Sequence, residues 1–418
     1  MAVLLAVLAA LLALPAAAGA QNAPPRPALP GAQAAILIDA RDGSVMFRRD
    51  PDERRSIAST TKLMTALLTL EHAKPSDVYR APAYDALPVE SKIDLRAGER
   101  MRVDDLLEAL LLESANDAAV TLAEGVSGAR QAFVRDMNAR ARELGLTGTS
   151  YANPIGLDDP DNYSTARDLA ALARRLMRDR RFASIVDMPV ANLESGARPR
   201  AVDNRNDLVG QYDFVEGVKT GHTGTAGYVL VGAARGPLGA RVISVVLGEP
   251  SEAARDTESL ALLRYGLAQF RRVQPLEASE PVATAAVKHF DERASLVPEN
   301  DALVVARRGQ RVRTSVDAPE ELEGELPAGH PVGRITVLRG DQVVRRVRLV
   351  TATDVPGAGP LRLVVSTLGV ALLPLLAALA LLVAGLVVVI RRRPPPKTGS
   401  RRGDREARRR ERERARAG

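Results

Sequence analysis

The chain has 418 residues, of which 46% are hydrophobic, 26% charged and only 3% aromatic, and it contains no Cys and no Trp. This length allows two or three domains, and the missing Cys excludes a disulfide scaffold, a Cys nucleophile and a thiolate metal site. The net charge of +7 comes from one end, because residues 391–418 hold 13 Lys and Arg against 4 Asp and Glu, so the chain before them sums to −2. That nearly neutral body, poor in aromatics, contradicts a nucleic-acid-binding function.

The N-terminus has the pattern of an export signal. Residues 2–14 are an uninterrupted apolar run, Pro15 ends it, and the small residues of Ala18-Gly19-Ala20 precede Gln21. No Lys or Arg stands before the run, and the run is short for a membrane span. We therefore predict a signal peptide over residues 1–20, followed by a Pro- and Ala-rich linker over 21–32.

Residues 33–272 alternate between strand and helix patterns. An Asp-Gly turn and flanking apolar runs predict a first hairpin, and a Gly-Pro-Leu-Gly turn predicts a second. Strands at both ends with helices between them predict an α+β domain over 33–272, in which helices flank an antiparallel sheet and the first and last strands are neighbours. The predicted elements are a hairpin at 35–47, helices at 59–73, 103–125, 130–144 and 165–178 (N-cap Ser164 or Thr165), strands at 228–232 and 242–247, and a helix at 251–270.

The C-terminal part predicts a small β domain and a membrane anchor. Residues 275–355 contain several alternating or β-branched runs and predict an all-β domain without chemistry of its own. Residues 363–390 carry no charged side chain and are long enough for one transmembrane helix. Because Arg391-Arg392-Arg393 follows at once, we expect the tail 391–418 to lie in the cytoplasm and the domains before the helix to lie outside.

The first group of residues with chemical potential is Ser59-Thr60-Thr61-Lys62. Positions i and i+3 share one helix face, so a neutral Lys62 amine can accept the proton of the Ser59 hydroxyl, which is a weak nucleophile without such help. Taken alone, Ser-x-x-Lys is more often a cap serine followed by a surface lysine. The chain has only six Lys, however, which makes the position of each one informative.

Two further groups follow in order along the chain. Ser114-Ala115-Asn116 interrupts an apolar helical stretch and can place a hydroxyl and an amide in one cavity, but taken alone it is better explained as a helix–helix turn with Asn116 as a cap. Lys219-Thr220-Gly221-His222 leads into a strand, where glycine allows backbone or ligand to come close. A second Lys-Thr-Gly at 397–399 lies in the tail and shows how weak that tripeptide is alone.

In combination the three groups are specific. Ser-x-x-Lys, Ser-x-Asn and Lys-Thr-Gly in this order on an exported chain resemble penicillin-binding proteins and serine β-lactamases. The longer strings ASTTKLMTALLTLE, SANDAAVTLAE, NPIGLDDPDNYSTARDLA and EGVKTGHTGTAGY are similar to those of low-molecular-mass D-alanyl-D-alanine carboxypeptidases, peptidase family S11. The resemblance covers about residues 30–272, and the segment 275–355 is compatible with the second domain of that family.

The resemblance implies roles for individual residues. Ser59 is expected to form the acyl-enzyme, Lys62 to activate it, and Ser114 to relay a proton to the leaving D-alanine. Asn116 is expected to orient Lys62 or the substrate amide. The substrate-binding set is completed by Lys219 and Thr220 for the terminal carboxylate, Gly221 in the same strand, and His222, whose backbone N–H joins that of Ser59 in the oxyanion hole.

The chain departs from the family pattern at three places. Ala115 replaces the frequent Gly of the middle group, and Ile155 stands in Asn-Pro-Ile-Gly where the family often has His, so no role is carried over to that side chain. The third departure is the predicted spanning helix, where many relatives have an amphipathic anchor. The resemblance implies no cofactor, no metal, peptidoglycan stem peptides as substrates and β-lactams as covalent inhibitors.

Two other functions remain open at this point. A serine β-lactamase needs rapid hydrolysis of its acyl-enzyme, commonly through a Glu, and Gly156–Pro160 offers no Glu. A non-catalytic penicillin-fold scaffold has no need of the intact Ser59 and Lys62. A Ser-His-Asp protease and a metallohydrolase are weaker alternatives, because only His222 of four His lies in a suggestive setting and no His-Glu-x-x-His run exists.

Overall fold

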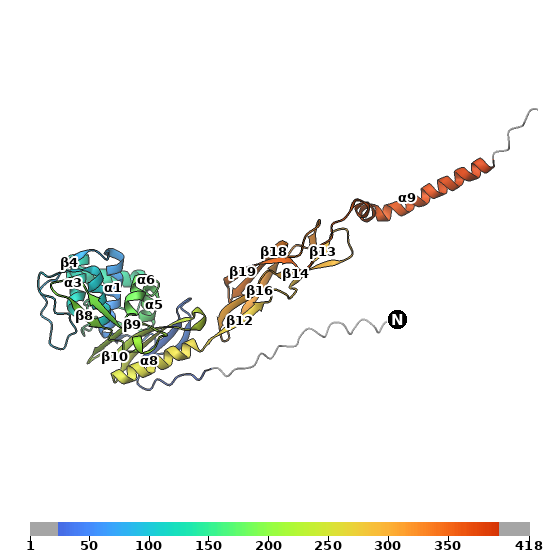
Figure 1. The fold of residues 1–418 in the computed structure, drawn as a ribbon. Helices are drawn as coiled ribbons and strands as arrows, with labels where there is room; N and C mark the ends of the chain where they lie inside the picture. Colours follow the sequence, from blue (N-terminus) through green and yellow to red (C-terminus); the bar gives the residue numbers. More distant parts are fainter. Residues whose placement is uncertain (1–23, 393–418) are drawn as a thin grey trace, which may run out of the picture. The chain divides into compact units, whose positions relative to one another are not determined.

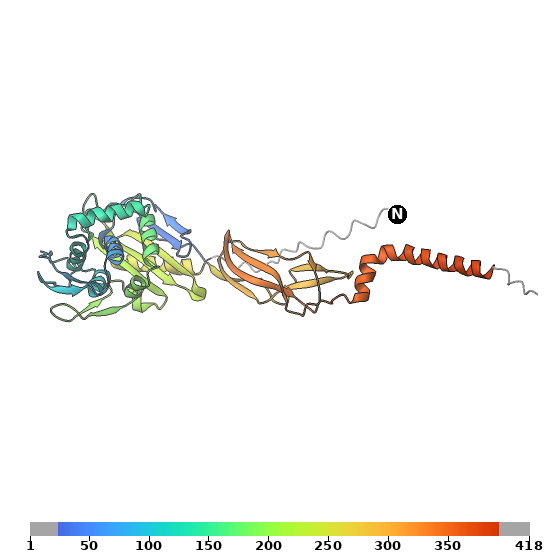
Figure 2. The same cartoon turned by 90° about the horizontal axis from the view of Figure 1, so that it is seen from above.

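A computed structural model of the chain describes residues 24–392. The predicted signal peptide and residues 393–418 of the predicted tail lie outside this range. The described chain forms two compact units: 24–274 with 303–312 and 339–341, and the remainder from residue 275 on. Figures 1 and 2 show the helix-rich first unit and the strand-rich second unit, and each is described by itself below.

The first unit is built on a five-stranded antiparallel sheet of order β2-β1-β11-β10-β9. The prediction that the first and last strands are neighbours is confirmed, because β1 pairs with β11 in register Ala34↔Leu247. All six residues of β1 are buried, as expected for a strand covered on both faces. The strands are β1 (Ala34–Asp39), β2 (Val45–Arg49), β9 (Val215–Thr223), β10 (Gly227–Arg235) and β11 (Arg241–Glu249).

Helices cover both faces of this sheet (Figure 1). Strand residues alternate between the two faces, so Val229 and Val231 face one apolar core and Leu230 faces the other. The core shared with α8 includes Leu262 and Leu263 and also Leu208 of α7, and helices α1 to α6 build the opposite core. The helices are α1 (Lys62–His72), α2 (Val103–Glu108), α3 (Asn116–Ser127), α4 (Arg130–Glu143), α5 (Ala166–Leu176), α6 (Arg180–Val186), the short α7 (Leu208–Gln211) and α8 (Glu252–Leu267).

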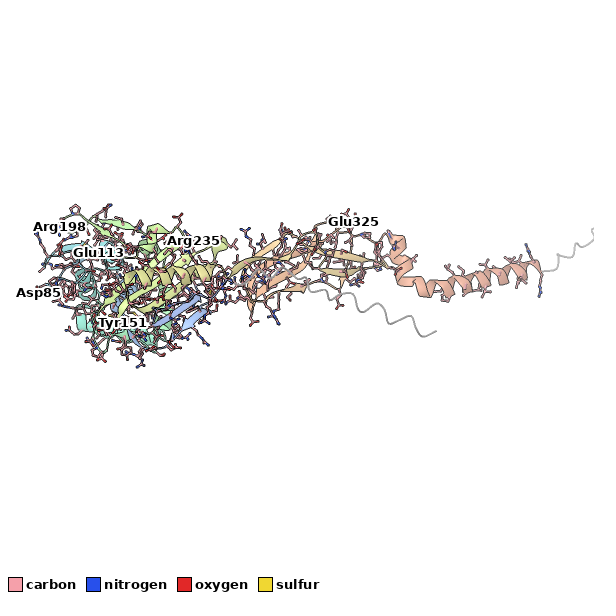
Figure 3. The ribbon with its side chains drawn as sticks, turned by 90° about the horizontal axis from the view of Figure 1, so that it is seen from below. Asp85, Glu113, Tyr151, Arg198, Arg235 and Glu325 are labelled. Carbon is pink, nitrogen blue, oxygen red and sulfur yellow. The ribbon has the colours of Figure 1, made fainter. Side chains whose placement is uncertain are left out.

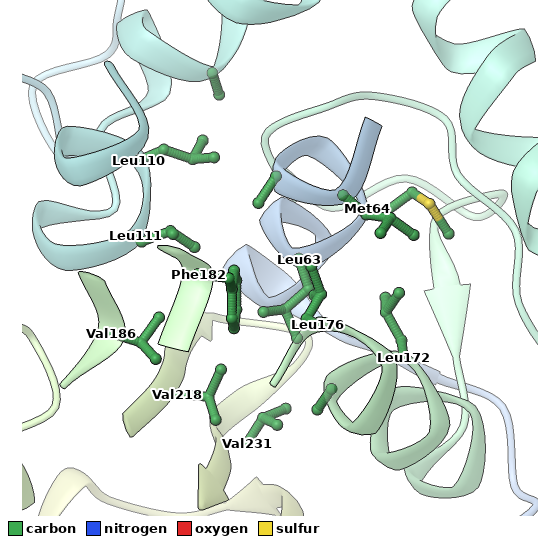
Figure 4. Packing of buried hydrophobic residues seen from close by; sticks show 14 of the residues in the cluster. Leu63, Met64, Leu110, Leu111, Leu172, Leu176, Phe182, Val186, Val218 and Val231 are labelled. Carbon is green, nitrogen blue, oxygen red and sulfur yellow. The ribbon is translucent and has the colours of Figure 1, made fainter. Parts of the chain in front are cut away.

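The larger core holds α1 close to the edge strand of the sheet. Leu63 of α1 packs with Leu176 and Phe182, and Val218 and Val231 of the sheet lie beneath them (Figure 4). These side chains are at most 1% exposed. Burial of a large aliphatic or aromatic side chain contributes about 1.5–3 kcal/mol each, so the start of α1 is firmly placed beside β9.

The prediction of one continuous helix over 103–125 is wrong. The single helix expected over 103–125 is instead α2, a π-helical turn η2 (Ala109–Glu113), a break at Ser114, and α3 from Asn116. Ser114 adopts a left-handed conformation with φ of 66°, which a continuous helix does not tolerate. The apolar periodicity runs through both helices and conceals this break. The predicted cap of α5 is confirmed at Thr165, whose side chain accepts a hydrogen bond from Asp168 N.

Three short ribbons complete the first unit. Their strands lie in segments that the hydrophobic pattern does not single out, because each contains only two to four residues. They pair as β3 (Arg55–Ser56) with β6 (Tyr163–Ser164), β4 (Val78–Arg80) with β5 (Arg100–Arg102), and β7 (Val190–Leu193) with β8 (Arg200–Asp203).

The second unit contains a six-stranded sheet of order β16-β18-β19-β14-β13-β17. The expected all-β composition of this segment is found. The strands of the sheet are β13 (Ala283–Val287), β14 (Arg293–Pro298), β16 (Val312–Asp317), β17 (Glu321–Leu322), β18 (Pro331–Arg339) and β19 (Gln342–Thr351). A separate pair joins β12 (Phe270–Leu276) to β15 (Ala302–Arg307), and all of its residues except 275, 276 and 302 belong to the first unit.

The last described element is the long helix α9 (Pro360–Arg391). Its part from Pro374 to Arg391 has a mean hydropathy of 2.5 and is exposed throughout. Among the described residues it is the one helix whose length and composition suit a membrane span. It covers the segment 363–390 that the sequence predicts as transmembrane.

Candidate active site

Ser59 and Lys62 come together where η1 (Ala58–Thr61) passes into α1. Lys62 Nζ lies 3.0 Å from Ser59 Oγ and also donates to the backbone carbonyl of Ile155 at 2.5 Å. The Lys62 side chain is fully buried, whereas Ser59 keeps partial exposure. A hydroxyl that substrate can reach therefore stands against an amine that bulk water cannot reach.

Two glycines bring neighbouring segments against the backbone of the Ser59 turn. A Cβ atom on Gly221 of β9 would lie 2.8 Å from Ser59 N. A Cβ atom on Gly156 would lie 2.1 Å from Ala58 O, and Gly156 also has a φ of +92°. Only glycine fits at either position, so β9 and the 153–160 segment can both reach the Ser59 N–H. The Ile155 side chain packs in the core, and its carbonyl is the group that faces Lys62.

The break between α2 and α3 presents the middle group. Ser114 is 6% exposed, and its Oγ has no hydrogen-bond partner among the described residues. Buried hydroxyls normally have a partner, so an unpaired one marks a place where a ligand or water can bind. Asn116, the first residue of α3, is also 6% exposed, and its Nδ2 donates to Glu90 Oε2 at 2.6 Å.

Cationic groups gather around strand β9. Lys219 is 1% exposed, and its Nζ donates to the Thr220 carbonyl at 3.2 Å. Burial, and after it the charges of Arg255 and Arg205, lower the pKa of Lys219 to about 7, against the opposing effect of Glu113. Sequence reasoning missed Arg255, which is 2% exposed on α8 and whose Nε donates to Asp256 at 2.8 Å.

The charge of buried Lys219 acts on buried Lys62. Burial lowers the pKa of Lys62 well below its ordinary value, the charge of Lys219 lowers it further, and Glu90 and Asp117 oppose the change. This is the direction expected when two ammonium groups share one cleft. A lysine whose pKa is lowered in this way is neutral in a larger fraction of molecules and can act as a base.

The end of strand β9 carries His222 and Thr223. His222 is exposed, and its ring stacks on Tyr228 with a centroid distance of 3.9 Å. Thr223 Oγ1 donates to Asp158 Oδ1 at 2.7 Å, which ties the strand end to the 153–160 segment. The structure thus brings Ser59 and Lys62 into contact and Gly221 against the Ser59 N–H. Strand β9, which also carries Lys219, Thr220 and His222, packs on η1 and on η2, the turn that ends at the α2–α3 break.

Comparison with known proteins agrees with this geometry. The family profile described as D-alanyl-D-alanine carboxypeptidase matches residues 21–251, and the profile described as penicillin-binding protein 5, C-terminal domain, matches residues 270–357. The chain is 29% identical over 349 residues to D-alanyl-D-alanine carboxypeptidase DacF of Bacillus subtilis, covering 81% of this chain and 89% of the relative. It is 33% identical over 337 residues to DacC of Escherichia coli, covering 76% and 83%.

Two solved structures also resemble the chain over most of its length. Penicillin-binding protein 5 from Haemophilus influenzae has a TM-score of 0.57 and 30% identity, with 79% of this chain and 99% of that chain covered. The carboxypeptidase DacD from Francisella tularensis has a TM-score of 0.56 and 26% identity, with 80% and 96% covered. The similarity therefore extends over both units.

Proposed function

The chain belongs to the serine-type D-alanyl-D-alanine carboxypeptidases, peptidase family S11, and we propose that its acyl-enzyme forms on Ser59. It is accordingly a hydrolase of peptidoglycan metabolism. The observation that supports Ser59 is its contact with a fully buried lysine of lowered pKa. The pair lies where η1 passes into α1, with Gly221 of β9 and the 153–160 segment against it.

Acylation follows from the contacts around Ser59. Neutral Lys62 takes the hydroxyl proton as Ser59 Oγ bonds to the carbonyl carbon of the penultimate D-alanine. The backbone N–H groups of Ser59 and His222 stabilise the oxyanion, and the close approach of Gly221 to Ser59 N supports this pairing. The C–N bond then breaks, and the proton held by Lys62 passes through Ser114 to the leaving amine.

Deacylation uses the same groups in reverse. Water attacks the acyl carbon, Lys62 accepts a water proton, and the ester C–O bond breaks as Ser59 Oγ regains a proton. The products are one D-alanine and a stem peptide shorter by one residue. The unpaired Ser114 hydroxyl supports a relay between lysine and leaving group in the first step.

We propose that the cationic side chains beside β9 bind the terminal carboxylate of the substrate. Lys219 provides a charge, Thr220 a hydroxyl, and Arg255 a second positive charge whose influence reaches Lys219. Binding of a carboxylate favours the protonated form of Lys219, because an opposite charge at short distance raises the pKa of an ammonium group. A free C-terminal carboxylate is therefore part of the preferred substrate.

The assignment is tested on the full-length protein in detergent. We expect fluorescent penicillin to label the chain covalently, mass spectrometry to locate the adduct on the peptide that contains Ser59, and a pentapeptide ending in D-Ala-D-Ala to release one D-alanine. A tripeptide stem without D-alanine is the control substrate. Rapid penicillin turnover without D-alanine release would instead indicate a β-lactamase, and labelling without either turnover would indicate a scaffold.

We also propose the domain limits and the topology. The carboxypeptidase domain spans 33–272, the small β domain 275–355 and the spanning helix 363–390, with the domains extracytoplasmic and the tail 391–418 cytoplasmic. The match of the two family profiles to 21–251 and 270–357 and the apolar stretch of α9 support this arrangement.

Because the chain has no Cys, single cysteines report topology without background. In intact cells whose outer layers admit the reagent, we expect a membrane-impermeant maleimide to label S76C and to leave S400C unlabelled until the membrane is opened. Ser76 is exposed in the first unit. Equal labelling of both variants in sealed cells would contradict the single-pass orientation.

A further inference from the structure

Glu90 makes contacts that the reaction outlined above does not use. It lies in the segment between β4 and β5, far in sequence from the three motif groups. Its Oε2 accepts a hydrogen bond from Asn116 Nδ2 at 2.6 Å and another from the Tyr84 hydroxyl. Its Oε1 accepts from the Leu87 N–H at 2.9 Å. Both oxygens of the carboxylate are therefore held, and the same segment also binds Asn116 through a bond from Asn116 N to the Ser91 carbonyl at 2.8 Å.

This carboxylate decides which way the Asn116 amide points. An amide has a donor end and an acceptor end, and an ionised carboxylate only accepts hydrogen bonds. Glu90 must therefore receive Nδ2, which leaves Oδ1 as the end available to Lys62 or to the amide of a substrate. Hydrogen bonds to a charged acceptor are stronger than those between neutral groups, so the orientation is well held.

Glu90 also contributes charge at the catalytic lysine. Burial raises the pKa of Glu90, but the bonds from Tyr84, Asn116 and the Leu87 N–H outweigh burial, and the pKa is lowered overall. The carboxylate thus stays ionised at neutral pH. The charged groups that act on Lys62 are Lys219, which favours its neutral form, and Glu90 and Asp117, which favour its protonated form.

We infer that Glu90 is a positioning residue for the reaction on Ser59: it holds the Asn116 amide in one orientation and balances the positive charge in the cleft. This inference rests on the proposed function. It assigns to the β4–β5 segment, which carries no motif residue, a direct part in arranging the site. Asp117 already has its own partners in the backbone N–H groups of Ile93 and Leu95, so it does not replace Glu90 at Asn116.

The experiment measures the second-order rate of penicillin acylation of the full-length protein against pH. E90A removes both charge and acceptor, and we expect the rate at the optimum to fall by about tenfold or more. E90Q keeps an acceptor for Asn116 but no charge, and we expect a fall of less than about threefold at the optimum. In both variants the acid limb should move to lower pH, because removing a nearby negative charge favours neutral Lys62.

D85N is the matched control. Asp85 is an exposed acidic residue of the same segment (Figure 3), and its replacement should leave the rate and the acid limb unchanged. Y84F removes one donor to Glu90 and should give a smaller loss than E90A, so the test survives if E90A fails to fold. If E90A, E90Q and Y84F all kept the wild-type acylation rate and the wild-type acid limb, this inference would be overturned while the proposed function would stand. A wild-type chain that is not acylated would overturn the proposed function together with it.

Discussion

Replacing Ser59 by alanine is expected to abolish covalent labelling by fluorescent penicillin and to reduce D-alanine release by at least about 10⁴-fold. The hydroxyl oxygen is the atom that bonds to the acyl carbon in the proposed reaction, and no other hydroxyl contacts Lys62 Nζ in the hydrogen bonds of the described residues. The measurement is gel fluorescence and D-alanine release with equal amounts of folded protein.

The control is S76A, which removes the hydroxyl of an exposed serine in the same unit. We expect it to be labelled and to turn over substrate as the wild type does. The S59A chain should keep its melting temperature, since Ser59 Oγ is only partly buried and its loss leaves no cavity of consequence. Persistent labelling of S59A would show that the acyl-enzyme forms elsewhere.

Replacing Lys62 is expected to have the second largest effect, a loss of acylation rate of about 10²–10⁴-fold. K62R keeps a positive charge but cannot serve as a base, because the guanidinium stays protonated in proteins. K62M keeps the length of the side chain without the amine. If a positive charge alone were needed, K62R would retain activity and K62M would not, so equal losses in both variants identify the base.

K74M is the matched control for Lys62. Lys74 is exposed and follows α1, so its loss removes a lysine of the same unit without touching the cleft. Acylation by K74M should equal that of the wild type. Lys62 is buried, and both of its variants therefore require a check of folding by circular dichroism before their rates are compared.

The lowered pKa values of Lys62 and Lys219 predict how the rate of the wild-type protein depends on pH. Burial and then Lys219 lower the pKa of Lys62, so the rate should rise with pH along an acid limb that lies well below the range in which an ordinary lysine loses its proton. Lys219 must keep its proton to bind a carboxylate, and its pKa of about 7 in the free enzyme sets an alkaline limb of kcat/KM. K219R should move that alkaline limb to higher pH, and an unmoved limb would contradict the assignment.

Local patterns were enough to predict much of the fold. The hairpin turns, the amphipathic helices and the Thr165 cap each depend on a few neighbouring residues, and the structure has them at or within a few residues of the expected bounds. The candidate membrane span was visible for the same reason, since 28 residues without a charge are a property of composition. The break at Ser114 escaped prediction because apolar periodicity continues on both sides of it.

The sequence alone was enough to predict the family and the three motif groups, because the type and order of residues do not depend on conformation. Only the tertiary structure decided that Arg255 of α8 acts on Lys219 and that Glu90 holds Asn116, since each pair is separated by 26 or more residues along the chain. It also decided that the Ile155 carbonyl, rather than its side chain, faces Lys62. Such contacts depend on how helices and loops pack over the sheet, and no short window of sequence encodes that packing.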